Sequence, residues 1–140
     1  MEYEALNGLD GSKYTVMIVD DIPINTRLLE KILSKANFRL RIFNDSQLAM
    51  DNIAEIDPDI LLMDVMMPGI DGFTFLTRLR SNPAFDHVRV VLVTAVSESE
   101  EILRAGTMGA NDYITKPINA KRVASSIAAQ IQAIEAARNK

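Results

Sequence analysis

Five short apolar runs alternate with longer segments of helical spacing, and this alternation limits the possible folds more than any other feature. The runs are Tyr14–Val19, Arg39–Phe43, Ile60–Met63, Val88–Val93 and Asp112–Thr115. Most are apolar throughout, as expected for strands buried on both faces of a sheet. Their short lengths and β-branched residues favour strands over buried helices.

The segments between the runs carry apolar residues at helical spacing. They are Ile24–Lys35, Gln47–Glu55 after a cap at Asp45 or Ser46, Phe73–Arg80, Glu98–Ala105 and a long segment from about Asn119. Alternation of strands and helices argues for a parallel sheet with helices on both faces. We therefore predict one doubly wound α/β domain of five βα units.

The composition limits the classes of function. A chain of 140 residues suits one domain, and its net charge of −4 with no dense Lys/Arg run argues against direct binding of nucleic acid. The absence of cysteine excludes disulfides, thiol nucleophiles and Cys-ligated zinc. Neither a signal peptide nor a membrane-length apolar run is present, so we expect a cytoplasmic protein.

Polar and charged residues stand where the predicted strands end. Asp20 and Asp21 follow the first run, Asp64 the third, Thr94 the fourth and Lys116 the fifth. Ligands bind at the carboxyl ends of the strands in an open α/β sheet. We therefore expect these five residues to meet in one pocket.

The chemistry of this residue set suggests a cation and a phosphoryl group. Three neighbouring carboxylates repel one another unless a cation neutralises them, and an all-oxygen ligand set favours a hard ion such as Mg²⁺. A lysine and a threonine hydroxyl opposite the acids suit an incoming phosphoryl group. An aspartate can act as the nucleophile and form an acyl phosphate.

Four motifs together carry a family resemblance. The order and spacing of VDD (Val19–Asp21), DxxMPxxDG (Asp64–Gly72), TA (Thr94-Ala95) and YxxKP (Tyr113–Pro117) resemble the response-regulator receiver domains of two-component signalling, the CheY-like family. The resemblance covers about residues 13–129. It implies a flavodoxin-like (βα)₅ fold with strand order 2-1-3-4-5.

The resemblance implies a role for each acidic residue. Asp64 would accept a phosphoryl group from the phosphohistidine of a histidine kinase or phosphotransfer protein. Asp21, Asp64 and the backbone carbonyl of Met66 would ligate Mg²⁺ (or Mn²⁺), and Asp20 would hold the ion through water.

The remaining motif residues would bind the phosphoryl group and respond to it. Lys116 would pair with one phosphoryl oxygen, and Thr94, followed by Ala95, would hydrogen-bond another. Tyr113 would swing inward as an aromatic switch. The Lys116–Pro117 peptide is expected to be cis, which is the state of only about 5% of X–Pro bonds.

The implied function is a phosphorylation-controlled switch, not an enzyme. The surface formed by the fourth helix, fifth strand and fifth helix would contact an output domain or a second copy of the chain. The alternative is a receiver-like interaction module that is never phosphorylated, although such modules normally lack the acids or the lysine. A phosphatase would need a second acid at Met66, and a flavin site would need a phosphate-cradling loop where DDIPIN stands.

Simpler explanations exist for single residues. Asp20 and Asp21 could cap the next helix, and Thr94 could do the same. Met63, Met66 and Met67 favour packing, and His87 is expected to be exposed and without a role.

Two apolar positions suggest slow self-dephosphorylation. Met66 lies two residues after Asp64, and Val96 lies two residues after Thr94. Neither side chain can orient an attacking water molecule.

The ends of the chain are expected to differ from its centre. Residues 1–12 are predicted to be a flexible leader, residues 13–130 the receiver domain, and residues 131–140 a helical extension or linker. The stripe Val123, Ile127, Ile131 and Ile134 predicts that the first half of the last helix packs on the sheet. Its end could be a frayed tail, a linker helix or a short coiled coil.

Overall fold

A five-stranded parallel sheet forms the centre of the molecule. The structure is a computed structural model that describes residues 4–95 and 98–139. The strands lie in the order β2-β1-β3-β4-β5. Their bounds are Thr15–Val19 (β1), Arg39–Phe43 (β2), Ile60–Met63 (β3), Arg89–Thr94 (β4) and Asp112–Thr115 (β5). The predicted fold class and strand order are confirmed.

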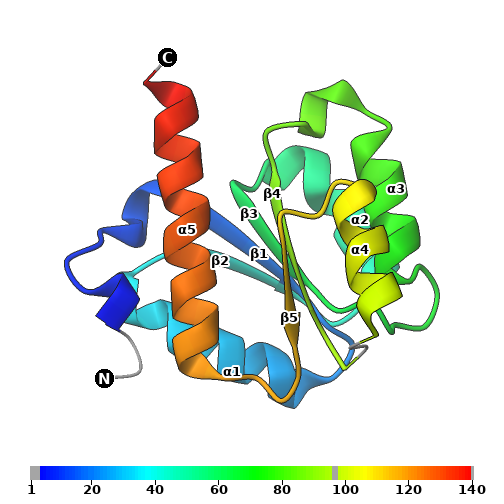
Figure 1. The fold of residues 1–140 in the computed structure, drawn as a ribbon, viewed down its shortest axis with the longest axis horizontal. Helices are drawn as coiled ribbons and strands as arrows, with labels where there is room; N and C mark the ends of the chain where they lie inside the picture. The colour runs from blue at the N-terminus through cyan, green and yellow to red at the C-terminus, as the bar shows by residue number, and fades with distance from the viewer. Residues whose placement is uncertain (1–3, 96–97, 140) are drawn as a thin grey trace.

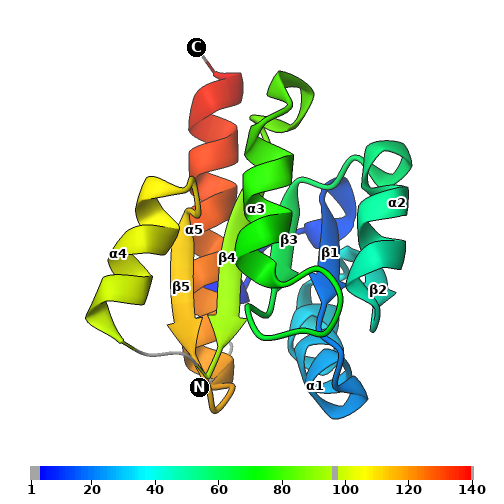
Figure 2. The same ribbon diagram turned by 90° about the vertical axis from the view of Figure 1, so that its right-hand side faces the viewer.

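Helices cover both faces of the sheet. Helices α1 and α5 lie on one face and α2, α3 and α4 on the other (Figures 1 and 2). Their bounds are Pro23–Leu33 (α1), Ser46–Ile56 (α2), Gly72–Arg80 (α3), Ser99–Thr107 (α4) and Ala120–Arg138 (α5), with short 3₁₀ turns at Glu4–Leu6 (η1), Gly11–Lys13 (η2), Ser34–Ala36 (η3) and Pro83–Phe85 (η4).

The sheet separates two apolar cores, because successive strand residues point to opposite faces. On β1, Val16 and Ile18 join the core beneath α1 and α5, whereas Met17 and Val19 join the core beneath α2 and α3. All four are fully buried. Both faces of the strand are thus covered, which explains why the run is apolar without alternation.

Side-chain caps define where several helices begin. The Asp45 carboxylate accepts a hydrogen bond from the Leu48 backbone N–H, and Asp71 accepts one from Thr74. At α5, Asn119 does the same. Each cap satisfies a backbone donor that the helix leaves unpaired, which is worth about 1 kcal/mol.

The N-terminal segment differs from the flexible leader expected for residues 1–12. Residues 1–3 lie outside the described residues, but Leu6 is only 3% exposed and belongs to the same core cluster as Ile131 and Ile134 of α5. Burial of these apolar side chains holds η1 against the helix. The domain boundary expected between residues 130 and 131 falls inside α5, which is continuous to Arg138.

Candidate functional site

The strand register places the predicted site residues side by side at one edge of the sheet. The parallel ladder continues one residue beyond the strands: the Asp64 N–H donates to the Val19 carbonyl at 3.0 Å, and the Lys116 N–H donates to the Thr94 carbonyl at 2.8 Å. Asp20 directly follows Val19. These residues therefore follow neighbouring strands at the carboxyl edge, which is the lower edge in Figure 2.

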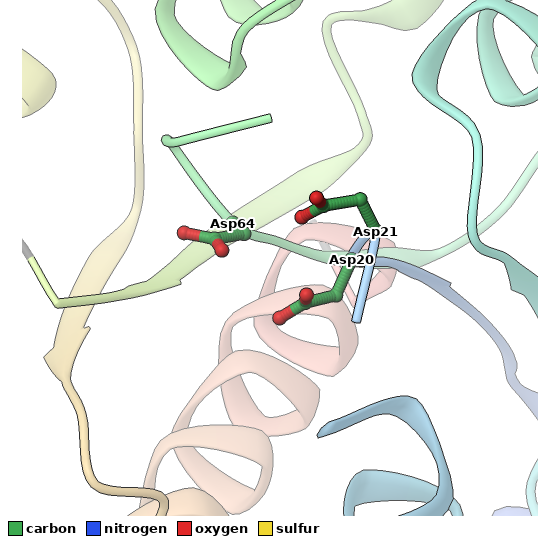
Figure 3. Close-up of side chains that lie close together, drawn as sticks. All are labelled: Asp20, Asp21 and Asp64. Atoms are coloured by element: carbon green, nitrogen blue, oxygen red, sulfur yellow. The ribbon is translucent and has the colours of Figure 1, made fainter. Parts of the chain in front are cut away.

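Three carboxylates converge there. One oxygen from each of Asp20, Asp21 and Asp64 lies within 4.8 Å of the others. The three side chains reach into the same space in Figure 3. Asp20 is 2% exposed and Asp64 is 4% exposed. Burying charges of one sign together is costly unless positive charge accompanies them.

Lys116 supplies part of that positive charge. Its Nζ donates to Asp20 Oδ2 at 3.0 Å and to Asp64 Oδ2 at 2.9 Å, and its side chain is only 16% exposed. Burial by itself lowers the pKa of Lys116, but the hydrogen bonds to Asp64 and Asp20 outweigh it and leave the pKa above its ordinary value. The ammonium group is therefore held in its charged form.

The Asp21 carboxylate fits a cation. Its Oδ1 is buried and is the one buried side-chain oxygen or nitrogen of residues 4–95 and 98–139 that has no hydrogen-bond partner. Such a group is costly in the absence of a ligand. The donors are all oxygens, so the set of Asp20, Asp21 and Asp64 suits Mg²⁺ or Mn²⁺.

The loop after β3 is held tightly behind the Asp64 carboxylate. The Met66 N–H donates to Asp64 Oδ1 at 3.2 Å, and the Gly72 N–H donates to the Val65 carbonyl at 2.8 Å. A Cβ atom on Gly72 would lie 2.5 Å from the Asp64 carbonyl oxygen, so no side chain fits there. On the sequence, Gly72 belongs to the DxxMPxxDG motif and, with Asp71, indicates a loop, but neither signal predicts this close approach.

The other motif residues lie on β4 and β5. Thr94 is fully buried at the end of β4, Ala95 follows it and is exposed, and Val96 lies outside the described residues. Tyr113 is half-buried on β5, where burial, Glu101 and Asp64 raise its pKa. The Lys116–Pro117 peptide is cis.

The simpler explanations do not account for the acids. The N-cap of α1 is Ile22, without a side-chain hydrogen bond, so neither Asp20 nor Asp21 caps that helix. The N-cap of α4 is Glu98, so Thr94 does not cap that one. Asp20 Oδ1 instead accepts from the Ile22 N–H at 3.0 Å, which shapes the turn after β1.

Two other expectations have different outcomes. Met63 and Met67 are buried as predicted, but Met66 is 65% exposed, so the packing interpretation was wrong for this residue. The exposed His87 was expected to have no role, yet its Nε2 lies 2.7 Å from Asp57 Oδ1 and joins two loops.

A family model described as the response regulator receiver domain matches residues 16–128. The chain belongs to the response regulator receiver family. The acids, the threonine and the lysine at the edge of the sheet all lie within the matched residues. The assignment makes the chain a receiver domain, which is consistent with two-component signalling.

Named relatives agree with the assignment. The chain is 40% identical over 104 residues to response regulator PleD of Caulobacter vibrioides, covering 74% of this chain and 23% of PleD. It is 37% identical over 111 residues to a protein-glutamate methylesterase/protein-glutamine glutaminase of Trichodesmium erythraeum, covering 76% of this chain and 31% of that protein. The chain thus spans less than a third of either relative.

A solved structure extends the match to three dimensions. The signal receiver domain of a signal transduction histidine kinase from Syntrophus aciditrophicus superposes with a TM-score of 0.77 and 27% identity. The match covers 86% of this chain and 91% of that one. Among the described residues, no helix is both long and apolar enough to cross a membrane.

Proposed function

We propose that Asp64 is the phosphoacceptor of this receiver domain and that the donor is the phosphohistidine of a histidine kinase or phosphotransfer protein. The observation that carries the proposal is the lysine bridge, in which Lys116 Nζ lies within 3.0 Å of both Asp20 and Asp64. An ammonium group beside a buried carboxylate can receive the negative charge that phosphorylation adds.

The transfer is a nucleophilic displacement at phosphorus. A carboxylate oxygen of Asp64 forms the new O–P bond as the P–N bond of the donor breaks, and the bonding electrons leave with the imidazole. Asp20, Asp21, Asp64 and the Met66 carbonyl would hold Mg²⁺. When bound, the ion supplies positive charge that offsets the repulsion between the phosphoryl oxygens and the acids.

Side chains near Asp64 then respond to its phosphorylation. Lys116 exchanges its contact with Asp64 Oδ2 for one with a phosphoryl oxygen, and the Thr94 hydroxyl donates to another. Tyr113 follows Thr94, and the surface of α4, β5 and α5 presents the change to an output domain or a second copy of the chain. The half-buried position of Tyr113 beside α4 supports this route.

The test is incubation with Mg²⁺ and acetyl phosphate, followed by intact-mass measurement. We expect wild type to gain one phosphoryl group, Asp64→Asn to gain none, and Asp51→Asn, at an exposed position on α2, to match wild type. Beryllofluoride should shift the amide resonances of wild type and leave those of Asp64→Asn unchanged.

Other results would contradict the proposal in different ways. Phosphorylation that persists in Asp64→Asn would show that another residue is the phosphoacceptor. No modification and no Mg²⁺ binding would favour the unphosphorylated interaction module. Continuous turnover of phosphate esters would indicate a phosphatase.

A further inference from the structure

A groove runs between α3 and α4 beside the phosphoacceptor loop. The two helices lie on the same face of the sheet (Figures 1 and 2). The groove contains two cavities of about 340 Å³ each, and both are lined by Asp71, Phe73 and Arg104. Val65 and Met66, which directly follow Asp64, line the cavity at one end. The α3–α4 groove is thus adjacent to the site but separate from its acids.

The chain's own Arg104 lies across this groove. Its guanidinium carbon is 4.7 Å from the centre of the Phe73 ring, and its Nη1 is 3.6 Å from Glu101 Oε2. The Phe73 ring and the Glu101 carboxylate therefore form a binding site for a guanidinium group. Because the Arg104 side chain is 57% exposed, both contacts are weak and the arginine can be displaced into solvent.

The chemistry of the lining indicates a cationic polypeptide. Around the cavity next to Met66, Asp71, Glu98 and Glu101 outnumber the single cation, Arg104, whereas Arg78 adds a second cation at the other cavity. Acidic residues in the first turn of α4 also interact favourably with the helix dipole. That interaction explains neither the position of the Phe73 ring beneath Arg104 nor the cavities. The exposed Met66 adds apolar surface that an inorganic ion would not use, and the Phe73 ring, which is 9% exposed beneath Arg104, lines the same cavity.

A metal ion fits this groove poorly. Among the described residues, the acids that converge closely enough to hold a metal are Asp20, Asp21 and Asp64, none of which lines the groove. We propose that the α3–α4 groove docks a segment of a partner protein whose arginine, flanked by apolar residues, replaces Arg104 over Phe73. This docking surface goes beyond the proposed phosphotransfer and does not require modification of Asp64.

The test uses two synthetic peptides, acetyl-Ala-Leu-Arg-Leu-Ala-amide and the same peptide with neutral citrulline in place of arginine. Each is titrated into the ¹⁵N-labelled full chain. We expect saturable shifts of the Val65, Met66, Phe73 and Glu101 amides with the arginine peptide and at least fivefold weaker binding of the citrulline peptide. The comparison isolates the charge because the two side chains have nearly the same shape.

Three variants sharpen the result. Arg104→Ala removes the internal competitor and should strengthen binding several-fold, whereas Glu101→Gln and Phe73→Leu should weaken it. Amide spectra of each free variant confirm that it is folded, and the Asp51→Asn variant, at an exposed position on α2, should bind like wild type. Equal binding of both peptides, weaker binding to Arg104→Ala, saturable shifts only elsewhere, or no saturable shifts would overturn the proposal.

Discussion

At the scale of single residues, the site depends on pairing between charges that are distant in sequence. Lys116 contacts Asp20 and Asp64 from a strand end 96 and 52 residues away, respectively. Without this contact, two buried carboxylates would face each other with no positive charge from the chain. The identity of each residue was predictable, but the bridge exists because parallel strands bring their carboxyl ends together.

Met66 provides a prediction about the lifetime of the phosphorylated state. The Met66 N–H contacts Asp64, whereas the exposed thioether cannot orient a water molecule for attack on the phosphoryl group. An asparagine side chain can do so, and we therefore expect phosphorylated Met66→Asn to release phosphate about tenfold faster than wild type, which corresponds to a hydrolysis barrier lower by roughly 1.4 kcal/mol. The measurement is inorganic phosphate released from phosphorylated protein. Leu48→Asn, at an exposed position on α2, should keep the wild-type rate. Loss of the phosphoryl group from wild type within seconds would contradict the predicted slow release.

At the scale of elements, Asp112 joins β5 to α5. Its carboxylate accepts both Nη groups of Arg122, at 2.8 and 3.2 Å, and the Ser126 hydroxyl at 2.6 Å. The Tyr113 N–H donates to the same side chain at 2.8 Å. This network sets the position of α5 relative to the strand that leads to Lys116.

The network predicts a pH dependence of stability. Burial alone would raise the pKa of Asp112, but hydrogen bonds from Arg122 and Ser126 outweigh it and lower the pKa. The stabilisation is therefore present above the unfolded-state value of about 3.9 and is lost as pH falls through the lower folded value. We expect Asp112→Asn to cost about 1.5 kcal/mol at pH 7.

Urea unfolding between pH 3 and pH 7 measures this effect. The difference between wild type and Asp112→Asn should shrink on the acid side, whereas exposed Asp51→Asn should stay within about 0.5 kcal/mol of wild type. A difference that is constant over this range would show that the charge of Asp112 is not responsible.

Arg80 connects several elements, and this role was not predicted from the sequence. Its guanidinium donates to the backbone carbonyls of Gly109, Phe85 and Val88 at 3.1, 2.9 and 2.6 Å and so joins the end of α3 to two loops. Burial lowers its pKa. On the sequence, Arg80 is one basic residue in the last turn of a helix, where arginine is common for reasons of the helix dipole alone.

At the scale of the whole molecule, the last turns of α5 are tied to the amino edge of the sheet, opposite Asp64. The Tyr14 hydroxyl donates to Glu135, and Arg138 Nη2 lies 3.2 Å from Asp59 Oδ1. Leu6 fills the same side of the core. The last turns of α5 are thus part of the domain and not a separate extension.

This arrangement predicts that the N-terminal turn contributes to global stability. Truncation of a buried leucine costs about 2–5 kcal/mol, and a site near a chain end can relax, so we expect about 2 kcal/mol for Leu6→Ala. Urea midpoints measure the change. Leu48→Ala is the matched control because the Leu48 side chain is exposed. Equal urea midpoints for the two variants would support the flexible leader expected from the sequence.

The five βα units and the acids, threonine and lysine at the carboxyl edge of the sheet were predictable from the amino-acid sequence, and the strand order was predictable through the family resemblance. These features are local, since each polar residue directly follows an apolar run. Other features arise from the three-dimensional packing: the lysine bridge, the close fit of Gly72 behind Asp64, the Arg80 contacts and the packing of Leu6 on α5. These features depend on contacts between side chains that are distant in sequence, across the sheet or between loops. The periodicity of apolar residues along the chain contains no information about such contacts.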